Sequence, residues 1–396
     1  MKLLFLISSL DLTQPFSATP AWWQLLKGLY EEGIDVLAAP YQGPAIESLW
    51  WRAVPNPARL EGDLFKRARD LLRRVRGRGH RADLDRPGAE DLTAGERLIH
   101  TVTQTLIVPR WKRALGRVLE RERDVDAVIF LTVPLNQLRG LARHLRDRYH
   151  VPVIAYDGDV PASLPGFQGF ASGFRIYPGA DLTEFDAFIS NSKGGAARLE
   201  AMGARPVHVL YYAVDPEVYQ PLSVPKDVDV FFYGHGAEYR AEWIEAMIAR
   251  PSRALPGARF AVRGARLGDL GRAETLPYLS FSRLREYVCR SRINLCITRR
   301  AHTSVYASSS MRPFELGALG ACIVANPYLG IEEWFDPGRE LMVVNDAEEA
   351  TDAYRWLLDH DDQRARMGEA ARARVLKAHT FRHRAAELRA IVEALR

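Results

Sequence analysis

Short apolar runs rich in β-branched and aromatic residues alternate with amphipathic segments of helical period along almost the whole chain. This alternation is typical of parallel sheets whose strands are joined by crossover helices, so it predicts an α/β fold. The strand candidates are 2–7, 34–39, 125–131, 151–156, 185–190 and 207–210 in the first half, then 228–233, 258–264, 293–298, 322–325 and 341–344. Helix candidates lie at 18–32, 238–250, 282–291 and 311–319, and three more close the chain at 347–360, 362–378 and 382–395.

The strand series is interrupted once, by the proline-rich stretch 213–225 (AVDPEVYQPLSVP), which has no helical period. A chain of 396 residues is long enough for two domains. We therefore expect two Rossmann-like sheets that face each other across a cleft, with ligands at the carboxyl ends of their strands.

Composition excludes several functional classes. The 54 Lys and Arg exceed the 49 Asp and Glu by only five, and 47% of the residues are hydrophobic, as in an ordinary globular protein. We expect no nucleic-acid partner from so small a charge excess. No apolar run approaches the ~20 residues of a membrane-spanning helix. Cys289, Cys296 and Cys322 form neither an even set for disulfides nor a zinc-binding spacing, which indicates a cytoplasmic protein.

One segment is strongly basic. Between Lys66 and Arg86, apolar residues at helical spacing share the sequence with many arginines. Such a helix can dock on its own domain, which is the commoner case, or lie on an anionic membrane surface. A peripheral contact with the inner membrane surface through Lys66–Arg86 is therefore one expectation.

The segment 299–325 (RRAHTSVYASSSMRPFELGALGACIVA) carries the strongest functional signal. A predicted strand ends in a loop rich in hydroxyl groups and arginine, and Pro313 then suits the first turn of a helix. The N–H groups and dipole of a helix N-terminus favour a phosphate. We expect a phosphate-binding loop formed by Ser308, Ser309, Ser310, Met311 and Arg312.

Glu315 follows one turn later. A carboxylate only accepts hydrogen bonds, so Glu315 could bind the two adjacent hydroxyls of a ribose. It could equally be a glutamate that only complements the helix dipole. Phosphate donors and a diol acceptor on one strand-loop-helix unit together indicate a nucleotide site.

A second loop, Gly234-His235-Gly236, follows the strand at 228–233 and leads to Arg240. Glycines allow backbone N–H groups to approach a phosphate, and an arginine can bind its oxygens in a bidentate manner. The loop lacks the third glycine of a dinucleotide-binding fingerprint and the Gly-Lys-Ser/Thr of a Walker loop.

In the first half, Asp157 and Asp159 follow a strand end. An Asp-x-Asp pair can hold a divalent metal, and Asp-Gly is also a favoured turn pair. We expect Asp157 to be the functional residue of the two.

The residues 310–384, with R-P-F-E, E-E-x-F-x-P-G-x-E and H-T-x-x-H-R motifs, closely resemble the C-terminal half of the two-Rossmann (GT-B) glycosyltransferases. The likeness is greatest to the group-1 branch that includes spore-maturation-type proteins. It implies an N-terminal acceptor-binding domain over residues 1–215, with a basic helical insertion at about 58–123. It also implies a donor-binding domain over 216–378 and a C-terminal helix, 379–396, that packs back on the N-terminal domain.

The resemblance implies a site as well. Glu315 matches the ribose-binding glutamate of the family, Gly234, Gly236 and the Ser308–Arg312 loop lie beside the donor phosphates, and Asp157, Arg240 and His235 form the catalytic set. Ser17, Asp159 and Arg299 are candidates for the acceptor or sugar side. Two positions depart from the family pattern: Ala307 stands where many retaining relatives have a glutamate, and Phe16, Ser17 and Ala18 replace a glycine pair.

We therefore expect an enzyme, a hexosyltransferase-type glycosyltransferase that moves a sugar from a UDP- or GDP-sugar to a glycan, lipid-linked or small-molecule acceptor. Retention of configuration and independence of metal ions and other cofactors are part of this expectation. The alternatives are a nucleotide-sugar epimerase or hydrolase on the same fold, and a non-catalytic protein that binds the membrane surface.

Overall fold

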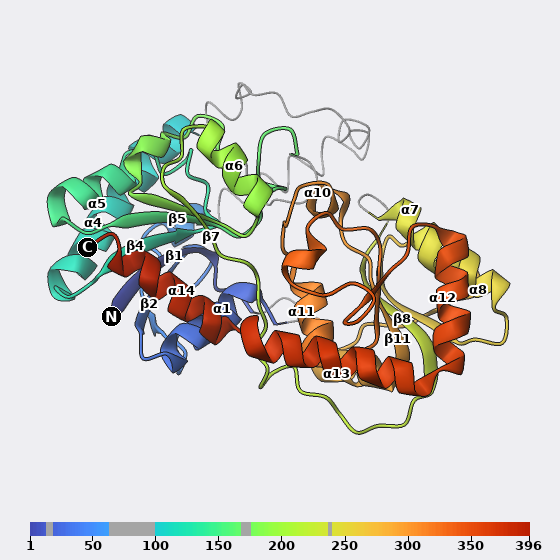
Figure 1. The fold of residues 1–396 in the computed structure, drawn as a ribbon. Helices are drawn as coiled ribbons and strands as arrows, with labels where there is room; N and C mark the ends of the chain where they lie inside the picture. The colour runs from blue at the N-terminus through green and yellow to red at the C-terminus, as the bar shows by residue number, and fades with distance from the viewer. Residues whose placement is uncertain (13–18, 63–99, 168–175, 237–239) are drawn as a thin grey trace. The chain divides into compact units, whose positions relative to one another are not determined.

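The computed structural model describes residues 1–12, 19–62, 100–167, 176–236 and 240–396. Their contacts group them into two compact units (Figure 1). The first comprises Met1–Gln14, Leu29–Leu210 and Ala385–Arg396, and the second comprises Pro15–Gly28 and Tyr211–Arg384. The sequence predicts a single division after residue 215. The predicted domain limits stay a prediction.

The first unit contains a parallel seven-stranded sheet of order β3-β2-β1-β4-β5-β6-β7. The strands are β1 (Lys2–Ser9), β2 (Asp35–Gln42), β3 (Arg52–Ala53), β4 (Ala127–Leu131), β5 (Val153–Asp157), β6 (Ala187–Ser190) and β7 (Val207–Val209). Its helices include α4 (Val108–Arg121), α5 (Leu141–Tyr149) and α6 (Lys193–Ala201), with short helical turns at Thr103–Ile107 and Leu182–Glu184. The helix α1 (Ala21–Glu31) runs from one unit into the other along the chain.

The central strands of this sheet are buried on both faces. Leu3 through Ile7 of β1 have no exposed surface, as expected for a strand between parallel neighbours that helices cover. Trp111, fully buried on α4, packs in the core formed by one of these faces. The continuous apolar runs of the sequence therefore correspond to the buried strands.

The second unit contains a parallel six-stranded sheet of order β10-β9-β8-β11-β12-β13. The strands are β8 (Val228–His235), β9 (Phe260–Ala265), β10 (Glu274–Thr275), β11 (Ser291–Cys296), β12 (Ile323–Ala325) and β13 (Met342–Val343). The helices are α7 (Ala241–Ile244), which continues through the π-turn Glu245–Ala249 into α8 (Arg250–Ala254), then α9 (Phe281–Arg290), α10 (Arg300–Thr303), α11 (Met311–Ala318), α12 (Ala347–Asp359) and α13 (Asp361–Ala378), with a short turn at Ile331–Glu333.

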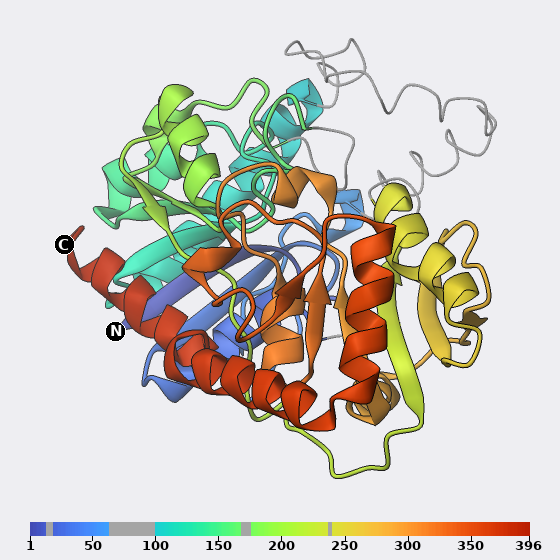
Figure 2. The ribbon, with the colours of Figure 1, turned by 45° about the vertical axis from the view of Figure 1, so that its right-hand side comes forward.

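Helices cover both faces of this second sheet (Figures 1 and 2). Phe231 and Tyr233 of β8 point to the core that α9, α11 and α13 complete, and Val230 and Phe232 point to the core on the side of α7, α8 and α12. The helices α11 and α13 approach closely because Gly368 leaves room for the carbonyl of Gly320, which a Cβ at residue 368 would meet at 2.1 Å. This packing fixes α11, the helix that carries Glu315.

The chain ends with α14 (Phe381–Glu393), which begins in the second unit and ends in the first. At its start, Phe381 N–H donates to the Val214 carbonyl and Val214 N–H to the His379 carbonyl, both at 3.1 Å. Near its other end, Arg396 forms an ion pair of 2.7 Å with Asp126.

The predicted α/β fold with two parallel sheets is confirmed, and each predicted strand run coincides with an observed strand. The two-residue strands β3 and β10 are absent from the prediction because such short edge segments carry no periodic signal. In the described part of the chain, no helix is long and apolar enough to cross a membrane. The segment Lys66–Arg86 lies outside the described residues.

Candidate nucleotide-binding site

The strand order of the second sheet reverses between β8 and β11. In open α/β sheets, ligands bind at the carboxyl ends of strands where the order reverses. Gly234 and His235, predicted to lie in a loop, are the last two residues of β8, with Gly236 directly after them, and the segment Thr298–Ser310 follows β11. Both predicted loops therefore lie at the same edge of the same sheet.

Arg240 joins the ends of these two strands. Its Nε donates to the Ile297 carbonyl at 2.6 Å and its Nη1 to the His235 carbonyl at 2.7 Å. Burial, together with the charges of Arg312 and Arg299, lowers the pKa of Arg240 to about 9. A bound anion would offset the repulsion among these three guanidinium charges.

Arg299 lies at the start of α10 and contacts a buried histidine. Its Nη2 is 3.4 Å from Nε2 of His302, whose side chain is almost fully enclosed. Burial, with the charges of Arg299 and Arg240, holds the pKa of His302 well below its usual range. His302 is therefore neutral at neutral pH and adds no charge to the arginine group.

Arg312 begins α11 and lies against Tyr233. Its guanidinium stacks over the Tyr233 ring and donates to the Tyr233 carbonyl, and its Nε is 3.3 Å from Oε2 of Glu315. These contacts hold Arg312 at the end of β8, beside Arg240.

Glu315 is buried, with 3% of its side chain exposed, and two tyrosines close over it. Tyr219 donates to Oε1 at 2.9 Å and Tyr233 donates to Oε2 at 3.0 Å. A carboxylate oxygen accepts about two hydrogen bonds. With Tyr233 and Arg312 on Oε2, the carboxylate keeps room for one further donor, on Oε1.

The predicted serine loop is only partly available to a ligand. Ser308 donates to the Val305 carbonyl at 2.8 Å, and Ser309 accepts the N–H of Tyr212 at 2.8 Å, and both serines are fully buried. Ser310 precedes α11 without capping it, and its Oγ is buried and meets no hydrogen-bond partner in the described part of the chain. Ser310, with the first N–H groups of α11 at Met311 and Arg312, is therefore the part of this loop that can bind a phosphate.

The glycines of the other loop have a structural role. A Cβ at Gly236 would lie 2.3 Å from the carbonyl oxygen of Arg266, and one at Gly264 would lie 1.9 Å from that of Gly234. The end of β8 thus packs directly on the backbone at the end of β9. His235 is exposed on this loop, and residues 237–239 lie outside the described residues.

Asp157 ends β5 in the first unit and is buried in a hydrogen-bond cluster. Its Oδ2 accepts Ser163 Oγ at 2.5 Å and Tyr177 Oη at 2.6 Å, and its Oδ1 accepts the N–H of Asp159 at 2.9 Å. Burial raises the pKa of Asp157 to about 6, against the opposing effect of these donors. The Asp157–Asp159 pair therefore forms a turn, and Asp157 titrates near neutral pH.

The predicted site residues are divided between the two units. Asp157 and Asp159 belong to the first unit, whereas Arg240, Arg299, Arg312 and Glu315 belong to the second. Ser17 lies outside the described residues. Among the residues that the structure describes, no three His, Cys, Asp or Glu side chains gather as ligands of a metal ion.

Sequence reasoning missed the tyrosines that hold Glu315. Tyr219 lies in the proline-rich stretch after β7 and Tyr233 near the end of β8, respectively 96 and 82 residues before Glu315. Tyr233 immediately precedes the Gly234–Gly236 loop, which is the one local signal that could have identified it. Nothing in the sequence around Tyr219 distinguishes it from a linker residue.

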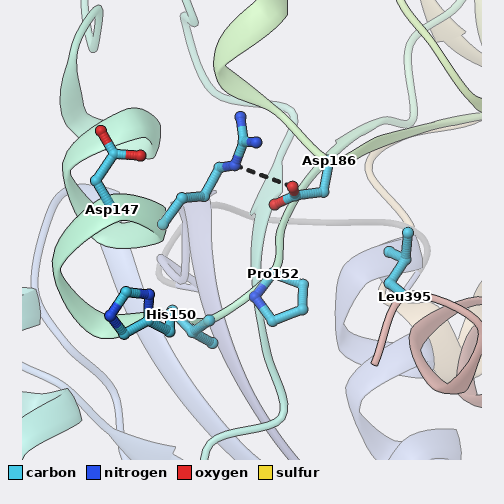
Figure 3. Close-up of a pocket in the computed structure, with 7 residues that line it drawn as sticks. Asp147, His150, Pro152, Asp186 and Leu395 are labelled. Carbon is cyan, nitrogen blue, oxygen red and sulfur yellow. Dashed lines mark ion pairs between the residues drawn. The ribbon is translucent and has the colours of Figure 1, made fainter.

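A pocket of about 530 Å³ opens elsewhere on the first unit (Figure 3). It lies at the amino ends of β5 and β6, beside the ion pair of 2.9 Å between Arg146 and Asp186. Asp157 is at the carboxyl end of β5, so this pocket contains none of the predicted site residues.

Comparisons with known proteins bear on the family and the fold. Residues 240–390 match a family model described as "Glycosyl transferase-like". The chain is similar to sucrose-phosphate synthase from Thermosynechococcus elongatus, with 13% identity and a TM-score of 0.64 over 100% of this chain and 98% of that one. Similar values hold for α,α-trehalose 6-phosphate synthase from Burkholderia multivorans, with 13% identity and a TM-score of 0.61 over 100% and 98% of the two chains. The Anabaena protein HepE, solved in complex with UDP, has 11% identity and a TM-score of 0.58 over 100% of both chains.

No curated protein matches the sequence significantly. At identities this low, the solved structures establish the fold, and the family match covers the region that contains Arg240, Arg312 and Glu315. The spore-maturation branch and the role of each site residue stay predictions. Residues 240–390 therefore resemble a glycosyltransferase domain, and the whole chain has the two-Rossmann (GT-B) fold.

Proposed function

We propose that the protein transfers a sugar from a nucleoside diphosphate sugar to a hydroxyl acceptor. The observation that carries this proposal is the group of Arg240, Arg299 and Arg312 where the strand order of the second sheet reverses. Three guanidiniums beside one carboxylate leave a net positive charge, which suits a diphosphate. The adjacent N-terminus of α11 supplies backbone N–H donors for the same group.

In the proposed reaction, the bond between the anomeric carbon and the donor phosphate oxygen breaks, and the departing diphosphate takes the electron pair. The arginines and the α11 N-terminus stabilise the developing charge without reorganising, which is the largest catalytic effect expected of such a site. Ser310 adds a hydroxyl donor. Glu315 accepts a ribose hydroxyl, and exposed His235 contacts the phosphates.

Retention of configuration is the finer proposal, and it rests on the family resemblance. The acceptor oxygen would then bond to the anomeric carbon from the side of the leaving phosphate, whose oxygen takes the acceptor proton. Asp157, with a pKa near 6, would orient the acceptor hydroxyl. Assigning the anomer of donor and product by NMR tests retention directly.

The donor is tested by incubating the protein with a panel of UDP- and GDP-sugars and measuring release of the nucleoside diphosphate, with Mg²⁺ and then with EDTA. HepE has been solved with UDP-glucose, so UDP-glucose is the first donor to try. We expect release that depends on one nucleotide, requires an acceptor and persists in EDTA. Release without any acceptor would indicate a hydrolase, and interconversion of the donor sugar would indicate an epimerase. Failure to bind any nucleotide would refute the proposal.

A cytoplasmic location with peripheral membrane contact is the second part of the proposal, and it rests on the basic sequence Lys66–Arg86. A lipid-linked acceptor would fit such a contact. Flotation with anionic liposomes, for the full chain and for a variant with the arginines of this segment changed to glutamine, tests it. Equal flotation of both proteins would refute a role for the segment.

A further inference from the structure

The carboxylate of Glu315 is not accessible to a ribose in this structure. Oε2 accepts Tyr233 and Arg312, and Oε1 accepts Tyr219, while only 3% of the side chain is exposed. A ribose presents two adjacent hydroxyls and cannot reach Glu315 until one of these groups moves away.

The two tyrosines differ in how firmly they are held. Tyr233 lies on β8, where its ring stacks with Phe231 at 5.8 Å between centroids and also contacts the Arg312 guanidinium. Tyr219 lies in no helix or strand, on the segment between β7 and β8. It is buried in the core of the second unit, where its ring meets Phe281 edge-on at 5.1 Å, and its N–H donates to the Asp215 carbonyl at 3.0 Å. Strand pairing and a stacked guanidinium hold Tyr233, whereas side-chain packing and one backbone hydrogen bond hold Tyr219, so Tyr219 is the candidate to move.

A phenol hydroxyl and a ribose hydroxyl are chemically equivalent for Glu315, since each is a neutral O–H donor to the carboxylate. Departure of Tyr219 would free both acceptor positions of Oε1 for the two ribose hydroxyls. Tyr233 and Arg312 would stay on Oε2 and keep the carboxylate in its orientation.

We infer that Tyr219 occupies the place of a ribose hydroxyl when the nucleotide site is empty and is displaced on binding, whereas Tyr233 is a positioning residue that holds Glu315 throughout. This inference rests on the proposed function. The inference predicts opposite effects of Tyr219→Phe and Tyr233→Phe on nucleotide affinity, although both substitutions remove the same hydroxyl group.

The experiment is titration calorimetry on the full chain with Tyr219→Phe and Tyr233→Phe. The ligands are UDP, 2′-deoxy-UDP and inorganic pyrophosphate, with the GDP series in place of UDP if the wild type prefers guanine. Tyr354→Phe is the matched control, because the Tyr354 hydroxyl is also buried and donates at 2.9 Å, to the Met247 carbonyl. Thermal unfolding of each variant checks that it is folded.

We expect Tyr219→Phe to bind UDP about three- to tenfold more tightly, since one net hydrogen bond no longer has to be broken. The gain in affinity should be smaller for 2′-deoxy-UDP, which lacks one ribose hydroxyl, and absent for pyrophosphate, which has no ribose. Tyr233→Phe should bind UDP about three- to tenfold more weakly, and Tyr354→Phe should match the wild type. A merely structural tyrosine would not increase affinity when its hydroxyl is removed.

Equal or weaker binding of UDP by Tyr219→Phe, with normal binding by the wild type, would overturn this inference and leave the proposed function intact. So would an equal gain for pyrophosphate. If the wild type binds no nucleoside diphosphate at all, the proposed function fails, and the inference fails with it.

Discussion

Arg312 and Glu315 lie one turn apart on α11, and Nε of the arginine is 3.3 Å from Oε2 of the glutamate. The pair joins a cation suited to a phosphate with a carboxylate suited to a ribose on one short helix. In the proposed complex, Arg312 would therefore bind the diphosphate and Glu315 would bind the ribose of the same nucleotide.

Glu315→Gln should weaken UDP binding about tenfold, because the amide offers one acceptor oxygen instead of two and loses the charge that strengthens the bond. Binding of pyrophosphate should be unchanged or tighter, because a negative charge is removed near the arginines. Calorimetry measures both. Glu348→Gln, which makes the same change in the first turn of α12 on an exposed residue, is the control. Equal loss of both ligands would contradict a ribose-specific role.

Arg240→Ala should lower kcat roughly 100-fold with a smaller effect on the donor KM, since the arginine is proposed to stabilise charge that develops on the leaving diphosphate. Steady-state kinetics with the donor found in the panel measure this. Arg250→Ala removes an exposed arginine from the neighbouring α8 and should leave kcat unchanged. A pure KM effect at residue 240 would assign Arg240 to ground-state binding alone.

Asp157 should make stability depend on pH. Burial raises its pKa from 3.8 to about 6, so the folded protein holds this proton more tightly than the unfolded chain does. Its contribution is complete below about pH 4 and is lost as the pH rises through 6. Two pKa units correspond to roughly 3 kcal/mol. Relative to Asp157→Asn, the wild type should lose about that much unfolding free energy between pH 4 and pH 7 in urea titrations. A pH-independent difference would show that the carboxyl titrates normally.

Gly236→Ala should destabilise the second unit by about 1–3 kcal/mol, because the added Cβ would meet the Arg266 carbonyl at 2.3 Å. Urea unfolding measures the loss. Gly257→Ala is the matched control, since a Cβ at that position meets nothing within 4 Å. If both variants are equally stable, the glycine is not required by this close approach, and phosphate binding becomes the better explanation of the loop.

The strand ends and loops that form the candidate site could largely be predicted from the sequence. The loops after β8 and β11 were found because each follows a strong apolar run, and parallel strands bring their carboxyl ends to one edge. Arg240, Arg312 and Glu315 were predicted as site residues from their places in or just after these segments, and their roles stay predictions. Ser308 and Ser309 were expected to meet phosphate, and the structure shows instead that their hydroxyls bond to the Val305 carbonyl and the Tyr212 N–H.

The sequence by itself determined the positions of the strands, the α/β class and the polar loops, because hydrophobic periodicity and turn residues act over a few neighbours. Only the tertiary structure decided which polar groups of those loops are hydrogen-bonded within the protein and which can still bind a ligand. Tyr219 and Tyr233 reach Glu315 from 96 and 82 residues away, and the guanidiniums of Arg240, Arg299 and Arg312 interact only once β8 and β11 pair. Contacts over such separations depend on packing, which leaves no local pattern in the chain.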